Sequence, residues 1–292
     1  MIAVDWGTSS LRAYRLDAQG QVVDARRSDQ GILASAGHFA EVLRGQIDGW
    51  PGDLLLCGMI GSRNGWIELP YLPCPADTPA LAAAMQRHED ASLPGRHLWF
   101  VPGVATRERS GVPDVMRGEE TQIVGLLPTL GPGRHTVCLP GTHCKWARVE
   151  GGRLVDFATT MTGELYALLR RHSILGKLMD GDGDDLHEDA FERGVTRSGE
   201  PGGLGHHLFG TRTLGLFERL PSNALASYLS GILIGHEIRD RQPIGDVVHL
   251  VGGSGLAQRY ARALGLLGVG SMRHGEDLAA TGLHLLARQR GL

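Results

Sequence analysis

The sequence predicts an α/β protein built from two similar lobes. A β-hairpin followed by a third strand and a helix opens the chain, and the same layout is repeated from residue 135 onward. Short apolar runs that end in glycine are typical of strands buried on both faces of a parallel sheet. A chain of 292 residues is long enough for two lobes. We place these lobes at residues 1–115 and 116–292, with the C-terminal helix able to pack back at the hinge.

The first lobe begins with alternating apolar residues on either side of the turn Gly7–Ser10, a pattern that predicts a β-hairpin. The segment "QGQVVDARR" adds a bend at Gly20 and a third strand. Helical spacing follows in "GHFAEVLRGQI". The runs "DLLLCGMIGS" and "LWFVPGV" then predict two buried strands, each ending near a glycine.

The second lobe begins with a helix in "GEETQIVGLL" and then repeats the N-terminal layout. Strands are expected at Val137–Leu139, Trp146–Val149 and Leu154–Phe157, with a turn at Pro140–Thr142. Helices are expected in "GELYALLRRHSIL" and "ALASYLSGILIGHEIRD". The segment "DVVHLVGGSGLAQRYARAL" predicts a strand, a glycine turn and a helix, and "HGEDLAATGLHLLARQR" predicts a final helix.

Composition and charge narrow the class of protein. The formal net charge is −3 and no block of lysine and arginine is present, so we expect no binding to nucleic acid or to an anionic membrane. No apolar stretch approaches the roughly 18–20 residues of a membrane span, and the start does not read as a signal peptide. We therefore expect a cytoplasmic protein. The four cysteines lack CxxC spacing, which favours reduced thiols over a zinc site or disulfides.

The turn Gly7–Ser10 offers backbone N–H groups and hydroxyls, which are donors suited to phosphate oxygens. Asp5 stands at the mouth of this turn and could hold a hydrated Mg²⁺ near the same phosphates. The alternative is a hairpin in which the aspartate only caps the turn. Both interpretations stay open on this turn alone.

A second turn, "LPGTHCKW", repeats the small-residue pattern. Gly141 and Thr142 form its tip, and Lys145 could add a cation. His143 is more simply a solvated turn residue, because no metal-ligand partner is spaced near it. The second turn therefore favours a phosphate site over two unrelated hairpins.

A third glycine turn, with Gly252, Gly253 and Gly255, joins a strand to a helix. Glycine there lets a nucleotide approach the backbone, and a helix N-terminus favours negative charge. The pattern GGSG does not fit the dinucleotide fingerprint, because it has no third glycine in register and no acidic residue at the right distance downstream. A P-loop ATPase is excluded, since no Walker lysine occurs in the sequence.

Two further groups of side chains are candidates. Glu119 and Glu120 open a predicted helix, where they either stabilise the helix dipole or supply a general base for phosphoryl transfer. The second group follows the buried strand predicted in "DLLLCGMIGS", and α/β proteins bind ligands at such strand ends. Its side chains are Ser62, Arg63, Asn64 and Trp66. Arg63 suits a carboxylate because its guanidinium is forked, although an exposed loop arginine is the plain alternative.

Three phosphate-type turns in this order, with a Gly-Glu-Glu helix before the second turn, resemble the actin-like ATPase (ribonuclease H-like) and sugar kinase superfamily. The motifs "CGMIGSRNGW", "PYLPCPAD", "DVMRGEETQIVG", "LPGTHCKW" and "YLSGILIGHE" resemble the 2-dehydro-3-deoxygalactonokinase family over nearly the whole chain. The resemblance implies a two-lobed fold with a central ATP cleft. It also implies ATP-dependent phosphorylation of 2-dehydro-3-deoxy-D-galactonate at its terminal (6-)hydroxyl, a step of galactonate catabolism.

The resemblance also implies roles for individual residues. Asp5 would hold Mg²⁺ through water, and Glu119 would be the base, with Glu120 as the alternative. The ATP phosphates would contact Gly7, Thr8, Ser9, Ser10, Arg12, Gly141, Thr142 and Lys145. Adenosine would contact Gly252, Gly253 and Ser254. The sugar acid would contact Ser62, Arg63 and Trp66. Cys144 stands where the family often has a serine, and a thiol is a weaker donor than a hydroxyl.

The helices "GEETQIVGLL" and "DLAATGLHLLA" would connect the lobes, and Ala280 and Gly282 are small enough for a close crossing at the hinge. Other activities stay open: a kinase of 2-dehydro-3-deoxygluconate or of another sugar acid, or an exopolyphosphatase-like phosphohydrolase. A sugar sensor without enzymatic activity is a third class. A homodimer is one option for the oligomeric state.

Overall fold

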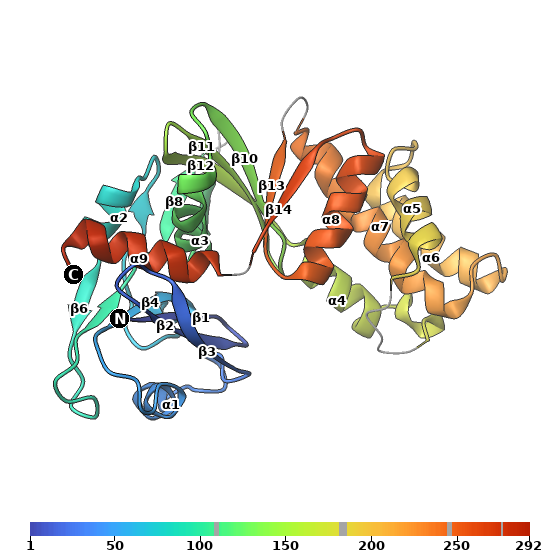
Figure 1. Cartoon of the computed structure of the whole chain (residues 1–292). Coiled ribbons are helices and arrows are strands. Elements are labelled where there is room, and N and C mark those ends of the chain that lie inside the picture. The colour runs from blue at the N-terminus through green and yellow to red at the C-terminus, as the bar shows by residue number, and fades with distance from the viewer. Residues whose placement is uncertain (108–110, 181–185, 244–246, 276) are drawn as a thin grey trace. The chain divides into compact units, whose positions relative to one another are not determined.

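The computed structural model describes residues 1–107, 111–180, 186–243, 247–275 and 277–292 (Figure 1). Within these ranges the strands form three sheets, which carry helices on several sides. This arrangement confirms the predicted α/β class.

The chain divides into two compact units. Unit 1 consists of Met1–Arg134, Ala147–Ala158 and Gly275–Leu292, and unit 2 consists of His135–Trp146 and Thr159–His274. Unit 1 thus extends beyond the expected boundary at residue 115 and includes the C-terminal helix. The reason is local packing, because the helix that follows Gly118 lies against the C-terminal helix within this unit.

The main sheet of unit 1 has the order β3-β2-β1-β4-β7-β6. Its strands are β1 (Ile2–Trp6), β2 (Leu11–Leu16), β3 (Val22–Ser28), β4 (Leu54–Gly58), β6 (Gln86–His88) and β7 (Leu98–Phe100). The antiparallel pair β1–β2 confirms the predicted hairpin and places Asp5 opposite Arg12. Strand β1 also runs parallel to β4, so that Asp5 lies beside Cys57. The hairpin that carries Asp5 is therefore anchored in the middle of the sheet.

The apolar core of unit 1 packs on this sheet. Helix α1 (Phe39–Gln46) buries Phe39 and Leu43 against residues of β1 and β4. The rings of Trp6 and Phe39 pack in a T-shaped pair, with centroids 5.7 Å apart. This core holds the strands behind the first turn rigid, because apolar residues of β1, β2 and β4 contribute to it together.

A smaller sheet of unit 1 has the order β5-β8-β9, with β5 (Leu72–Pro73), β8 (Val104–Arg107) and β9 (Pro113–Met116). Unit 1 also contains η1 (Met59–Gly61), α2 (Thr78–Ala84), α3 (Glu119–Leu126), η2 (Leu127–Thr129) and α9 (Leu278–Arg290). Helices α3 and α9 cross closely, since a Cβ on Gly282 would lie 1.9 Å from the carbonyl oxygen of Thr121. The small residue expected at Gly282 is thus required by backbone contact.

The second sheet has the order β12-β11-β10-β13-β14. Its strands are β10 (Arg134–Leu139), β11 (Cys144–Glu150), β12 (Arg153–Thr160), β13 (Val248–Val251) and β14 (Ser271–His274). The three strands predicted between Val137 and Phe157 are confirmed, although each is longer than its apolar stretch. Strand β13 runs parallel to β10 and β14, and it is buried along its length.

The helices of unit 2 are α4 (Thr162–His172), α5 (Glu188–Arg197), α6 (Gly203–Leu216), α7 (Ser222–Arg241) and α8 (Ser254–Leu266), with η3 (Gly176–Leu178). Helices α5, α6 and α7 lie together (Figure 1). A Cβ on Gly231 of α7 would lie 2.1 Å from the carbonyl oxygen of Phe191 on α5. In the described part of the chain, no helix has the length and apolar character needed to cross a bilayer.

Candidate active site

The first predicted phosphate turn is stabilised by a hydrogen bond from a separate segment of the chain, at Ile32. Within the turn, the backbone N–H of Gly7 donates to the carbonyl oxygen of Ser10 at 2.9 Å. The N–H of Ile32 donates to the carbonyl oxygen of Gly7 at 3.0 Å. Thr8 and Ser9 are exposed at the tip. The turn therefore has a fixed backbone and presents its hydroxyl side chains to the surface.

Asp5 lies behind this turn, and its side chain is only 15% exposed. Its Oδ2 is 3.9 Å from Nη1 of Arg12, and the thiol of Cys57 donates to Oδ1 at 4.0 Å. Burial raises the pKa of Asp5, while the positive charge of Arg12 opposes this shift. A second positive charge near the carboxylate would offset the desolvation, so the residue fits a hydrated divalent cation.

The two glutamates at the start of α3 differ in environment. Glu120 is buried and accepts hydrogen bonds from the N–H of Gly118 at 2.6 Å and from the hydroxyl of Thr121 at 2.9 Å. Burial, together with the nearby charge of Glu119, raises the pKa of Glu120 to about 8. Glu119 is half-buried and accepts from the N–H of Arg117 at 3.1 Å.

Gly58, at the end of β4, brings these features together within unit 1. A Cβ on Gly58 would lie 3.3 Å from Oδ1 of Asp5. A Cβ on Gly118 would lie 3.1 Å from the Cα of Gly58. The structure thus brings Asp5, the end of β4 and the start of α3 together within unit 1, and the action of these residues on one ligand stays a prediction.

The predicted substrate residues follow β4 and η1, and they have three different environments. Ser62 is buried, and its hydroxyl has no hydrogen-bond partner in the described part of the chain. Arg63 is exposed. Trp66 packs into the core of unit 1 and stacks on Phe39, with centroids 6.3 Å apart and an interplanar angle of 23°. The contact of these residues with a sugar acid stays a prediction.

The second predicted phosphate turn lies in unit 2 and is supported by α4. The N–H of Glu164 donates to the carbonyl oxygen of Thr142 at 3.0 Å, and a Cβ on Gly163 would lie 2.3 Å from the carbonyl oxygen of Gly141. Thr142 is exposed, whereas Lys145 is buried and donates to the hydroxyl of Thr159 at 2.8 Å. This turn, like the first, has a backbone fixed by an independent segment.

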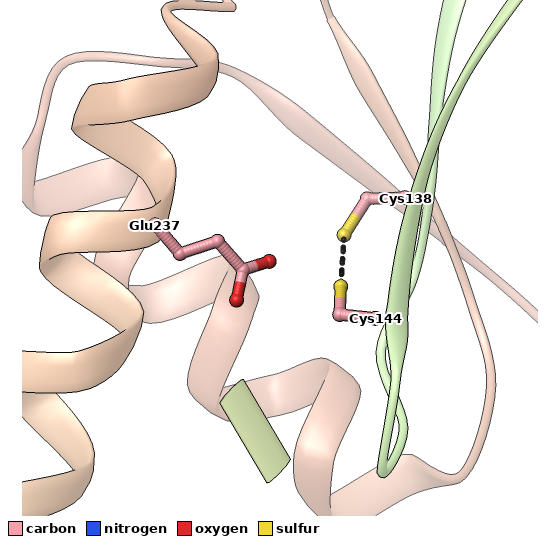
Figure 2. Close-up of side chains that lie close together, drawn as sticks. All are labelled: Cys138, Cys144 and Glu237. Atoms are coloured by element: carbon pink, nitrogen blue, oxygen red, sulfur yellow. Dashed lines mark hydrogen bonds between the residues drawn. The ribbon is translucent and has the colours of Figure 1, made fainter. Parts of the chain in front are cut away.

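Cys144 follows the turn, but its side chain points into the core (Figure 2). Its sulfur lies 3.6 Å from that of Cys138, and both thiols are fully buried. The ligand atoms of these cysteines and of Glu237 lie within 4.8 Å of one another. Burial raises the pKa of both thiols. The thiol at position 144 therefore lies away from the exposed tip of the turn.

Glu237 links two parts of unit 2 behind the turn. Its carboxylate accepts from Nε1 of Trp146 on β11 at 2.6 Å and from the hydroxyl of Tyr260 on α8 at 2.9 Å. These two donors satisfy the buried carboxylate, so the cysteine–glutamate cluster is explained by protein hydrogen bonds.

A cavity of about 350 Å³ opens beside the second turn, entirely within unit 2. It is lined by Gly141, Thr142, Thr162, Gly163, Tyr166, Ser230, Leu233, Ile234, Gly255, Leu256, Arg259 and Tyr260. A Cβ on Gly252 would lie 3.4 Å from the carbonyl oxygen of Pro140, so the third glycine turn touches the second turn directly. The structure thus brings together residues of the two turns that are more than a hundred positions apart.

Several residues at these sites were not predicted. Tyr166 and Arg259 line the cavity of unit 2, and Arg117 is buried next to the start of α3. The sequence offered one signal for Arg117, its position directly before Gly118-Glu119-Glu120. The side chain of Ser254, predicted to border the adenosine, lies outside the described part of the structure.

Comparisons with known proteins give a consistent result. The sequence model of the family described as 2-keto-3-deoxy-galactonokinase matches residues 5–286. A probable 2-dehydro-3-deoxygalactonokinase from Rhizobium meliloti (strain 1021) is 38% identical, covering 90% of this chain and 88% of that protein. The 2-dehydro-3-deoxygalactonokinase of Escherichia coli (strain K12) is 33% identical, covering 91% and 90% of the two chains.

Solved structures agree with the sequence comparisons. The crystal structure of a candidate 2-dehydro-3-deoxygalactonokinase from Sinorhizobium meliloti superposes with a TM-score of 0.90 at 37% identity, over 98% of each chain. An activator of 2-hydroxyisocaproyl-CoA dehydratase from Clostridium difficile has a TM-score of 0.54 at 12% identity, over 100% of this chain and 96% of that one, and shows a likeness of fold alone. The predicted actin-like ATPase fold class is confirmed. On this combined evidence, the chain belongs to the 2-keto-3-deoxy-galactonokinase family.

Proposed function

We propose that this protein transfers the γ-phosphoryl group of ATP to the terminal hydroxyl of 2-dehydro-3-deoxy-D-galactonate. Its family and the names of its relatives support this reaction. The structural observation that carries the proposal is the cavity of unit 2, which is bordered by the second phosphate turn and by the helix that follows the third glycine turn. A cavity of about 350 Å³ suits a ligand the size of a nucleoside.

In this proposal the adenosine occupies the cavity. Gly252 and Gly253 allow the nucleotide to approach the backbone, and the N-terminus of α8 favours the negative charge of the phosphates. Tyr166 and Leu256 supply apolar surface for the base. Thr142 lies on the wall of the same cavity, so that its hydroxyl can meet the phosphate end of the nucleotide.

Backbone and hydroxyl donors of Gly7–Ser10 and of Gly141–Thr142 bind the β- and γ-phosphates in this proposal, with Arg12 and Lys145 adding positive charge. Asp5 would hold Mg²⁺ through water, and the bound ion would neutralise charge on the phosphate oxygens. Two observations support this role for Asp5. Its carboxylate is partly exposed, and the single cation near it among the described residues, Arg12, is 3.9 Å away, so its charge is only weakly neutralised. Positioning and charge neutralisation account for most of the acceleration in such reactions.

Glu119 is the proposed general base, which takes the proton from the attacking hydroxyl. Its partial exposure supports this choice over Glu120. Both oxygens of Glu120 already accept hydrogen bonds from the start of α3, which suits a residue that fixes the helix start. Ser62, Arg63 and Trp66 are proposed to contact the sugar acid, and the unpartnered hydroxyl of Ser62 supports this role for Ser62 in particular.

The test is a coupled assay of ADP release with MgATP and each of two acceptors, 2-dehydro-3-deoxy-D-galactonate and its gluconate epimer. We expect turnover with the galactonate derivative to exceed that with its epimer. A preference for the epimer would change the substrate but keep the kinase. Release of phosphate from polyphosphate, without turnover of either acid, would support a phosphohydrolase and contradict the proposal. The cytoplasmic location and a homodimer stay predictions.

A further inference from the structure

Arg117 is a buried cation that has no ion partner within the described ranges of the chain. It stands between β9 and α3, and its side chain is only 7% exposed. Its Nη2 donates to the carbonyl oxygen of Leu69 at 2.8 Å, and its guanidinium carbon lies 4.3 Å from the centroid of the Tyr71 ring. Among the described residues, no carboxylate lies within ion-pair distance of it, and its Nε and Nη1 have no acceptor.

This combination is unfavourable for the protein alone. A guanidinium stays charged in proteins and carries five N–H donors, so burial cannot be relieved by loss of a proton. A buried charge is normally paired, because the loss of its hydration is large. One carbonyl oxygen and one aromatic ring offset only part of this loss. The guanidinium of Arg117 therefore keeps donor groups that suit an anionic ligand.

A second donor that has no partner among the described residues belongs to Ser62, and the residue before Ser62 contacts Arg117. A Cβ on Gly61 would be 3.2 Å from Nη1 of Arg117, and Ser62 is the next residue in the chain. The hydroxyl of Ser62 is enclosed and has no partner in the described ranges, and this side chain is also 7% exposed. A forked guanidinium beside a hydroxyl is a typical donor set for a carboxylate.

We propose that Arg117, with Ser62, binds the carboxylate of the acceptor sugar acid. The inference rests on the proposed function and assigns one end of its substrate. Arg117 is covalently adjacent to the start of α3, and its backbone N–H already donates to Glu119. The acid carries its carboxylate and its reacting hydroxyl at opposite ends. An anchoring cation and a base on neighbouring residues can therefore hold the two ends of one ligand.

This assignment differs from the expectation that Arg63 clamps the carboxylate. Arg63 is exposed, so its charge is hydrated and screened by salt. Arg117 is shielded from water, so each hydrogen bond to a carboxylate there is stronger. The Nε and Nη1 atoms of Arg117 are enclosed, so a neighbouring side chain has to move before the acid can reach them. Tyr71 covers one face of the guanidinium and is 41% exposed, so it is the neighbour best placed to turn outward.

The test compares Arg117→Lys and Ser62→Ala with the control Arg96→Lys. Arg96 is matched because it also donates to a backbone carbonyl, that of Trp50, and has one unpartnered buried nitrogen among the described residues. Steady-state kinetics would use MgATP with 2-dehydro-3-deoxy-D-galactonate and with its neutral methyl ester. We expect Arg117→Lys to raise KM for the acid by about 10- to 100-fold, because the bidentate contact is lost.

The pattern of effects separates binding from structural damage. Arg117→Lys should leave KM for ATP and KM for the ester within about twofold, because neither depends on the carboxylate contact. Ser62→Ala should raise KM for the acid several-fold, and Arg96→Lys should change none of these constants. An unchanged KM for the acid in folded Arg117→Lys, or an equal rise for the ester, would overturn the inference. If Arg117→Lys does not fold, Ser62→Ala carries the same test.

Failure of the proposed function can be recognised separately. If the unaltered enzyme turns over no acceptor, calorimetry with the galactonate acid still measures its binding. Weaker binding of the acid to Arg117→Lys or Ser62→Ala would then support the carboxylate site without the kinase reaction. Equal binding to all variants, or no binding to the unaltered protein, would overturn the site.

Discussion

Gly118 and Gly58 are in near backbone contact, since a Cβ on Gly118 would lie 3.1 Å from the Cα of Gly58. Gly118 also has a φ of 110°, a conformation that favours glycine. This contact joins the start of α3, which carries Glu119 and Glu120, to the end of β4 beside Asp5. The spacing of the proposed catalytic carboxylates therefore depends on the absence of side chains at two positions.

Gly118→Ala should damage both stability and activity. The added Cβ meets backbone and strains φ, so we expect a loss of about 1–3 kcal/mol in the free energy of unfolding. Turnover should fall further than stability alone explains, because α3 has to shift. Urea denaturation and kcat measure the two effects. Gly45→Ala, in α1 with open space around the glycine, is the control, and it should stabilise by about 0.5–1 kcal/mol. Normal kcat in Gly118→Ala would show that the contact is dispensable.

Glu120 should make stability depend on pH. Its pKa is about 8 in the folded chain and near 4.5 when unfolded, so the folded state retains a proton that the unfolded state loses. The contribution of the protonated Glu120 to the free energy of unfolding is fully present below pH 4.5 and is lost as the pH rises to 8. Between pH 6 and 8 we expect a loss on the order of 2 kcal/mol that Glu120→Gln lacks. Urea denaturation at both pH values tests this, and equal pH dependence in the two proteins would contradict it.

Glu119→Gln should lower kcat by roughly 10²–10⁴-fold if Glu119 is the base, with little change in KM for ATP. Glu120→Gln should have a smaller effect, because its amide oxygen can still accept from the N–H of Gly118 and its amide N–H can donate to the hydroxyl oxygen of Thr121. Both variants keep the volume of the side chain, so each serves as the control for the other. The reverse ranking of the two kcat values would transfer the base to Glu120.

Gly255→Leu should fill the proposed adenosine cavity. Gly255 lines the cavity, and a Cβ there would meet no atom within 4 Å, so the larger residue can be accommodated without displacing the chain. We expect KM for ATP to rise by about tenfold or more with the KM for the acid unchanged, because apolar contacts of the base are replaced. Gly265→Leu, in open space at the other end of α8, is the matched control. Equal KM values for ATP in both variants would exclude this cavity as the nucleotide site.

Features set by local pattern could be predicted from the sequence. The hairpin beside Asp5, the strand behind Gly58 and the helix at Glu119 follow from apolar periodicity and glycine positions within short windows. The enclosed donors of Arg117 and the cavity position of Arg259 could not be predicted. Both depend on contacts between segments distant in sequence, such as Arg117 with Leu69, and no local periodicity encodes these contacts. Helices α5 and α6 were not predicted, because the acidic and glycine-rich sequence before α5 is typical of a surface loop and the glycines within α6 weaken its helical pattern.

Asp5→Asn should separate stability from activity. Burial raises the pKa of Asp5, so the ionised carboxylate destabilises the fold once the pH exceeds its ordinary value near 3.8. The neutral amide removes this destabilisation, and urea denaturation at pH 8 should show a variant at least as stable as the unaltered protein. Its kcat should nevertheless collapse, because an amide cannot supply the charge that holds a hydrated Mg²⁺. Raising the Mg²⁺ concentration should not restore turnover.

A stable variant with near-normal kcat would remove Asp5 from the metal role, whereas an unstable variant would show that the carboxylate is needed for the fold itself.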